Sequence, residues 1–291
     1  MNGDKRGGVF MNGKKYIVLI ICLLFAYGMA AQELIILYTN DIHSQMDSQT
    51  SGQSVGLGGV ERRAACIEEV RKTNPHNVIL LDAGDYNQGT PYYNLFGGKL
   101  EVELMNAMGY DVVTLGNHEF DNGQKDLAKR LKKAKYVSLC ANYSFHQTPL
   151  KRVIKPYTII KRNGYKIGII GVTVTLQGVV AEAAIKNLTF QNPVPIVNQW
   201  AEKLKKEYKC DLVICLSHLG YDGGSPQRPS DIYLAEHTRN IDLIIGGHTH
   251  TLLAHPDIRK NLDGKEVPIL QADSRGTHVG RVDIYAPALS H

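Results

Sequence analysis

Short apolar runs and amphipathic segments alternate along this chain. The apolar runs are rich in Val, Ile and Leu, and they span residues 34–40, 77–85, 111–117, 165–173, 211–218 and 242–248. Nearly continuous apolar strands are typical of sheets that are covered on both faces. The pattern therefore predicts six buried strands.

Segments with helical spacing of their apolar positions lie between most of these strands. They cover residues 58–73, 99–109, 123–134, 196–208 and 230–240. Strands that alternate with helices indicate a layered α/β domain. Residues 267–287, VPILQADSRGTHVGRVDIYAP, predict a closing β-hairpin. We expect one domain over residues 32–291.

The N-terminal residues have the order of an export signal. Lys14 and Lys15 precede the apolar run YIVLIICLLFAYGMAA, which ends in small residues. A charged start, a short apolar core and small residues at the end are typical of a secretory signal peptide. The run is also shorter than the usual membrane-spanning helix.

We therefore expect residues 1–31 to be a signal peptide that is cleaved near Ala30 or Ala31. Met11 begins a cleaner signal than the first residue does, and an uncleaved membrane anchor is the alternative structure. With the signal removed, the protein is expected in the periplasm or outside the cell, without a stable membrane anchor.

Charge and cysteine content add little to this picture. Residues 32–291 hold 29 basic and 27 acidic residues, so the net charge of +5 for the whole chain falls to +2. No dense basic patch suggests nucleic-acid binding, and the run KRLKKAK around Arg130 is expected to be a solvated helix face. The four cysteines of this part show no CxxC spacing and are expected to be buried free thiols.

The informative polar residues stand where the predicted strands end. Five strand ends carry Asp, Asn or His, and ligands gather at the carboxyl ends of strands in open α/β sheets. The candidate metal ligands are Asp41, His43, Asp85, Asn117, His218, His248 and His250. Each pattern is weak alone, but five in succession predict a metal site.

Carboxylate, imidazole and amide donors suit zinc, manganese or iron(II), and no thiolate demands a softer metal. Seven donors are too many for one ion. Two divalent ions that share one carboxylate would use them all, and such a pair can hold both the attacking and the leaving oxygen of a phosphoryl displacement.

The same blocks resemble a known family. NDIHS, DAGD, GNHEFD, SHLG and GGHTH are similar to the five blocks of the calcineurin-like metallophosphatases. GLGGVERRA, GNHEFDNG and VPILQADSRGTHVGRVDI further resemble the metallophosphatase domain of secreted bacterial 5′-nucleotidases and UDP-sugar hydrolases. The resemblance covers residues 32–291 and implies a four-layer α/β/β/α sandwich of two mixed sheets.

The resemblance also allocates the ligands. It implies that Asp41, His43 and His250 hold the first ion, that a second trio holds the other ion, and that Asp85 bridges the two. The second trio is Asn117, His218 and His248. Many family nucleotidases have glutamine at the position of His250, so this chain follows the wider superfamily there.

The motif GNHEFDNG holds a metal ligand, Asn117, and two residues that are expected to act on the substrate. His118 is expected to face the substrate, where it stabilises the transferring phosphoryl group or protonates the leaving group, with Asp121 as its carboxylate partner. A metal-bridging hydroxide would be the nucleophile. The rival role for Glu119 is that of the general base in an HExxH zinc peptidase. That motif requires a second histidine one helical turn later, and this sequence has none there.

Three functions remain open from the sequence. The first is a 5′-nucleotidase-type phosphomonoesterase whose specificity comes from a separate chain, because the usual C-terminal nucleotide-binding domain is expected to be absent. The second is a broader phosphodiesterase or a UDP-sugar or cyclic-nucleotide hydrolase that acts alone. The third is a non-catalytic exported metal-binding subunit. Tyr86, Tyr92 and Tyr93 are expected to line the substrate pocket.

Overall fold

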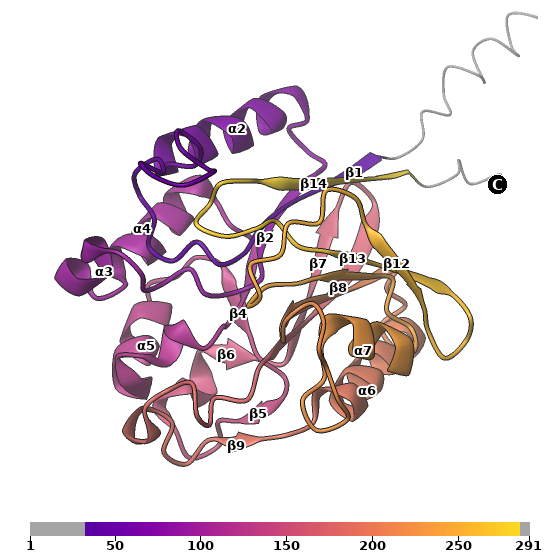
Figure 1. Cartoon of the computed structure of the whole chain (residues 1–291). Coiled ribbons are helices and arrows are strands. Elements are labelled where there is room, and N and C mark those ends of the chain that lie inside the picture. The colour runs from indigo at the N-terminus through magenta and orange to yellow at the C-terminus, as the bar shows by residue number, and fades with distance from the viewer. Residues whose placement is uncertain (1–32, 286–291) are drawn as a thin grey trace, which may run out of the picture. The chain divides into compact units, whose positions relative to one another are not determined.

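Two sheets of six strands each form the centre of the protein (Figure 1). The computed structural model describes residues 33–285, of which residues 34–284 form one compact unit. The first sheet has the order β14 (Gly280–Tyr285), β1 (Glu33–Thr39), β2 (Val78–Asp82), β3 (Val112–Thr114), β4 (Val137–Leu139), β6 (Ile154–Lys155). The second has the order β12 (Asp257–Lys260), β13 (Glu266–Leu270), β11 (Leu243–Ile245), β10 (Leu212–His218), β8 (Tyr165–Thr173), β7 (Tyr157–Arg162).

Helices lie on the outer sides of the two sheets. In Figure 1, α2, α4 and α5 lie on one side of the strands, and α6 and α7 lie on the other. The helices are α2 (Val60–Thr73), α3 (Pro91–Phe96), α4 (Lys99–Met108), α5 (Gly123–Leu131), α6 (Pro193–Lys206) and α7 (Asp231–His237). Short 3-10 turns are η1 (His118–Phe120), η2 (Pro149–Arg152) and η3 (Glu182–Ala184), and β5 (Tyr143–Ser144) pairs with β9 (Thr189–Phe190).

Two glycines of β8 show why four layers pack closely. A Cβ at Gly171 would lie 2.5 Å from the Cβ of Leu139, so this face of β8 touches the first sheet. A Cβ at Gly168 would lie 2.8 Å from Cδ1 of Leu204, so the opposite face touches α6. Because β8 is covered by a sheet on one face and by a helix on the other, the predicted four-layer α/β/β/α sandwich is confirmed.

Local sequence explains where the helices over the second sheet begin. Asn192 caps α6, because its side chain accepts a hydrogen bond from the Val194 amide at 3.0 Å and Pro193 occupies the first helical position. Ser230 caps α7 by accepting from the amide of Tyr233 at 3.2 Å. Helix α6 then packs on β8 and β10.

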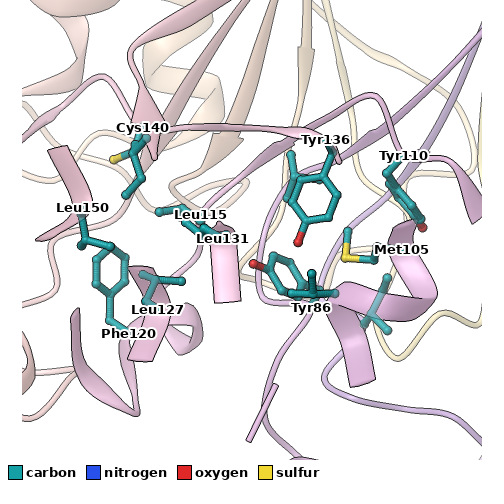
Figure 2. Close-up of a cluster of buried hydrophobic side chains, with 14 of the residues drawn as sticks. Tyr86, Met105, Tyr110, Leu115, Phe120, Leu127, Leu131, Tyr136, Cys140 and Leu150 are labelled. Carbon is teal, nitrogen blue, oxygen red and sulfur yellow. The ribbon is translucent and has the colours of Figure 1, made fainter. Parts of the chain in front are cut away.

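The first sheet and its helices share one apolar core. Strand β2 is buried along its whole length, and Leu80 and Leu81 are fully buried. Each such leucine contributes about 1.5–3 kcal/mol relative to an exposed position. Figure 2 shows Tyr86 and Tyr136 in this core with their hydroxyls turned toward each other, and their rings meet edge to face at 6.4 Å.

The parallel strands place their carboxyl ends at the same edges. Strands β1, β2, β3 and β4 run parallel in the first sheet, and β8, β10, β11 and β13 run parallel in the second. All six predicted strands are present. Strands β4 and β7 were not predicted; β7 is an edge strand that stays half-exposed, so it lacks the continuous burial of the predicted strands.

The predicted closing hairpin is wrong. Strand β13 pairs with β11 and β12 in the second sheet, whereas β14 lies beside β1 in the first. The connecting segment is held by the end of β1 instead of forming a turn. The side chain of Asn40 accepts from the amide of Ala272 at 2.8 Å, and the carbonyl of Asp41 accepts from the amide of Arg275 at 2.6 Å.

The predicted signal segment, residues 1–31, lies outside the described residues. Among residues 33–285, none of the helices has the length and apolar character that a membrane crossing requires.

Candidate metal centre

The candidate ligands come from the carboxyl ends of both sheets. The first sheet supplies Asp41 and His43 after β1, Asp85 after β2 and Asn117 after β3; the second supplies His218 at the end of β10 and His248 and His250 after β11. Donor atoms of six of these residues fall into groups of three in which all donor atoms lie within 4.8 Å of one another.

Asp41, His43 and His250 form the first of these groups. The two imidazole Nε2 atoms lie 2.9 Å apart, and Nε2 of His250 lies 3.4 Å from Oδ1 of Asp41. The side chain of Asn40 donates to Oδ2 of Asp41 at 2.7 Å, and the amide of His248 donates to the same oxygen at 2.9 Å. Asp41 is thus fixed by both sheets.

Asp85, His218 and His248 form another group. Nε2 of His218 lies 3.0 Å from Oδ2 of Asp85, and the rings of His218 and His248 lie 5.2 Å apart. Nδ1 of His218 donates to the carbonyl of Ala83 at 2.7 Å, which leaves Nε2 as the donor atom toward the site. Asp85 also belongs to a group with His43 and His118, so its carboxylate lies between the two sides of the site.

Asn117 supports the idea that the site takes a cation. Its Oδ1 is buried and has no hydrogen-bond partner among the described residues. Burying an amide oxygen without a partner costs free energy, so a cation at this atom would be stabilising. An amide oxygen is also a suitable donor for a hard or borderline divalent ion.

The charges of the site also favour the binding of cations. Burial opposes a charge on His218, but the carboxylates of Asp85 and Asp41 raise the pKa of His218 to about 10. Burial also opposes ionisation of Asp85, yet the surrounding histidines hold its pKa below the usual range. The carboxylates therefore attract positive charge, which divalent cations would supply. Burial lowers the pKa of His248 to about 4, so its imidazole is neutral, the form that binds metal.

The backbone is left-handed at many of these positions. The φ angles of Asp41, His43, Asp85, His248 and His250 lie between 50° and 76°. This region costs a non-glycine residue on the order of 1–3 kcal/mol and is concentrated at functional sites. Gly116 is needed for another reason, since a Cβ there would lie 2.1 Å from Oδ1 of Asp85.

His118 and Asp121 lie together beside the ligands. Nδ1 of His118 lies 2.8 Å from Oδ2 of Asp121, and the two side chains remain about a quarter exposed, at 28% and 25%. The hydrogen bond with Asp121 raises the pKa of His118, although partial burial opposes it. The ring of His118 lies 5.4 Å from that of His43, so it can reach a molecule bound at the metal centre.

Comparison with protein families agrees with this geometry. The model of the calcineurin-like phosphoesterases matches residues 34–252, which include all the candidate ligands. The chain belongs to the calcineurin-like phosphoesterase family.

Relatives of this phosphoesterase chain are nucleotidases. It is 34% identical over 285 residues to the snake venom 5′-nucleotidase of Gloydius brevicauda, covering 90% of this chain and 47% of that protein. The 5′-nucleotidase precursor of Thermus thermophilus has a similar structure, with a TM-score of 0.76, 31% identity, and coverage of 87% of this chain and 51% of that one. The Haemophilus influenzae NAD nucleotidase has a TM-score of 0.77, 30% identity, and coverage of 88% and 47%. The chain spans about half the length of the relatives it matches.

Two expectations about residues near the phosphoesterase site are wrong. Tyr86 and Tyr93 are buried, so they pack in the core instead of lining a pocket, whereas Tyr92 lines a cavity beside Gly89 and binds Asp47 through its hydroxyl at 3.0 Å. Arg130 is only 2% exposed, although the charged run KRLKKAK that contains it was predicted to be a solvated helix face. It turns inward because it pairs with Asp126 at 2.7 Å.

The thiols are free, as expected, although Cys66 is exposed and not buried. The sequence reasoning also missed Asn40, whose contacts fix Asp41. The sequence predicts for Glu119 only the rival role of a general base. A single Asn or Glu beside a candidate ligand does not show, from sequence alone, whether it positions that ligand or takes part in catalysis. Glu119 is fully buried and accepts hydrogen bonds from backbone amides.

Proposed function

We propose that this phosphoesterase chain hydrolyses phosphomonoesters, with 5′-nucleotides as the main substrate class, at a centre of two divalent cations. The observation that carries the proposal is the convergence of six carboxylate and imidazole donors beside the His118–Asp121 pair, together with the buried, unpaired Oδ1 of Asn117. A metal-binding subunit without activity would have no use for a positioned imidazole at such a centre.

The residues fit two ions that share a carboxylate. Asp41, His43 and His250 would hold one ion, Asn117, His218 and His248 would hold the other, and Asp85 would contribute to both. When bound, divalent ions such as zinc, manganese or iron would supply the activated water that attacks phosphorus and would offset charge on the phosphoryl oxygens.

His118 and Asp121 would act on the substrate. Asp121 accepts the Nδ1 proton and fixes the ring, so a proton on Nε2 points away from Asp121. The imidazolium can hydrogen-bond to a phosphoryl oxygen or give this proton to the departing alkoxide. The raised pKa of His118 favours the charged ring that both roles need.

The names of the relatives support nucleotides as substrates, and the NAD nucleotidase suggests that dinucleotides belong in the same test. With Tyr86 and Tyr93 buried, only Tyr92 of these three tyrosines lines a cavity, so they do not form a two-sided aromatic clamp for a base. We therefore place base recognition outside residues 34–284, for example in a separate chain that carries a nucleotide-binding domain.

We expect metal-reconstituted protein to hydrolyse AMP, GMP and UMP with similar kcat/KM and high KM, since contacts remote from phosphate are what raise kcat/KM selectively. Steady-state rates on these three, an aryl phosphate, NAD, UDP-glucose, cyclic nucleotides and bis(p-nitrophenyl) phosphate would check this. Preference for the diester would favour the broader phosphodiesterase, and no hydrolysis of any substrate would favour a binding subunit.

Export is part of the same proposal. It is supported by the charged start and short apolar run within residues 1–31. N-terminal sequencing of the protein after expression with this segment would show cleavage near Ala30 or Ala31, and an intact N-terminus in the membrane fraction would contradict it.

A further inference from the structure

Glu119 is a fully buried carboxylate directly behind the metal centre. Its Oε2 accepts from the amide of Asp85 at 2.9 Å and from the amide of Gly116 at 2.6 Å. Its Oε1 accepts from the amide of Asn87 at 3.2 Å. One side chain therefore holds three backbone N–H groups.

These three amides belong to two different loops. Asp85 and Asn87 lie in the segment between β2 and α3, while Gly116 lies in the segment between β3 and η1. The second segment continues directly into Asn117 and His118. Glu119 thus fixes the loop that carries the shared ligand against the loop that carries another ligand and the candidate acid.

A second contact between the same two loops depends on how far apart Glu119 holds them. The amide of His118 donates to Oδ1 of Asp85 at 2.8 Å. Gly116 leaves no space for adjustment, since a Cβ there would overlap this oxygen. A small displacement of either loop would therefore change the direction of the Asp85 carboxylate.

The turn η1 is also fixed from the side of α5. Nη2 of the buried Arg130 donates to the carbonyl of Glu119 at 3.0 Å, and Nε of Arg130 donates to Asp126 at 2.7 Å. Arg130 thus holds the backbone of Glu119, while the side chain of Glu119 holds the two loops. This chain of contacts links helix α5 to the metal centre.

We propose that Glu119 is a positioning residue that sets the place of Asp85 relative to Asn117 and His118, and that it takes no part in proton transfer. The proposal rests on the proposed function only for its effect on catalysis. Both carboxylate oxygens accept from backbone amides, and the side chain is 0% exposed, so it has no access to substrate or bulk water.

Glutamine cannot replace this carboxylate. A glutamine side chain has one acceptor oxygen, whereas Glu119 uses both of its oxygens. Whichever way the amide turns, its NH₂ group faces at least one backbone N–H group. Glu119→Gln therefore loses at least one hydrogen bond without a change in side-chain volume.

Two measurements test the proposal. In the metal-free protein, amide hydrogen exchange of Asp85, Asn87 and Gly116 should be slow in the wild type and faster at one or more of them in Glu119→Gln. In the Mn²⁺ form, Glu119→Gln should lose about 10–100-fold in metal affinity or kcat, the usual effect of residues that orient metal ligands. KM should change little, and the EPR signal of the coupled Mn²⁺ pair should change shape.

Asp111→Asn is the matched control. Asp111 directly precedes β3, at the end of that strand opposite to the site; it accepts from the amide of Leu80 in the middle of β2 at 2.9 Å and also pairs with Arg162. This variant should lower thermal stability while leaving the exchange of the Gly116 amide, the EPR signal and kcat unchanged.

The outcomes separate this proposal from the proposed function. Wild-type exchange of the Asp85 and Gly116 amides at the rate of exposed loops would overturn the positioning role, even if Glu119→Gln did not fold. Unchanged exchange, EPR signal and kcat in a folded Glu119→Gln would also overturn it. If the wild type binds no metal pair and hydrolyses no phosphoester, the proposed function fails, while the exchange result still decides the role of Glu119.

Discussion

His118→Asn is expected to lower kcat by roughly 10²–10⁴-fold while both ions remain bound, because a positioned acid–base group has an effect of this size. Nδ1 of the ring is engaged by Asp121, and the ring lies 5.4 Å from that of the candidate ligand His43. Asparagine keeps a polar side chain of similar reach but cannot carry the proton. Steady-state rates with elemental analysis of the same samples would measure the effect.

Asp121→Asn should lower kcat by no more than His118→Asn does, because the ring of His118 remains present and only the carboxylate that orients it is lost. The matched control is His237→Asn. His237 is also half-buried with Nδ1 bound to a carbonyl, that of Tyr233 at 2.8 Å, but it ends α7 away from the candidate ligands. Release of an ion by His118→Asn, with activity falling only in proportion, would make His118 a ligand instead.

Asp85→Asn is expected to remove most of both ions and to lower kcat/KM on the order of 10³-fold. The loss follows because metal ions contribute several kcal/mol of charge stabilisation, and each 1.36 kcal/mol corresponds to a factor of ten. Asparagine suits this position better than alanine, since φ is 55° and asparagine tolerates the left-handed region. The variant therefore tests the charge and not the backbone.

Metal content of purified wild type and variant, under metal-replete conditions, measures this directly. Asp82→Asn is the control, because Asp82 is also a fully buried carboxylate at the end of β2 but accepts from the Thr39 hydroxyl and the Gly84 amide and belongs to none of the candidate ligand groups. It should keep two ions per chain. One ion in the wild type, or two ions in Asp85→Asn, would contradict a shared carboxylate.

The candidate site could be predicted from sequence because its physical cause is local. Each ligand follows an apolar strand within a few residues, and parallel strands bring their carboxyl ends to one edge. His218 shows this most simply, since it is itself the last residue of β10. Pattern and chemistry therefore pointed to the same positions.

The errors concern residues whose environment is set by distant contacts. Arg130 has the sequence neighbourhood of a solvated residue, and only its contacts with Asp126 and with the carbonyl of Glu119 turn it inward. The sequence of β13 and β14 predicts a hairpin, because the residues near them in sequence do not reveal the contact of Asn40 with the segment between the two strands. Tyr86 follows a ligand directly but belongs to the core beneath it.

The donors are divided between the two sheets, and this division orders the events of folding. Four candidate donors belong to the strand ends of the first sheet and three to those of the second, so we expect the full set of donors to form only after the sheets have packed. An interaction that is absent from the transition state slows unfolding and leaves the folding rate unchanged. Refolding with and without Mn²⁺ should therefore proceed at the same rate, while unfolding in denaturant should be slower with the metal; faster refolding with Mn²⁺ would show that the donors meet early.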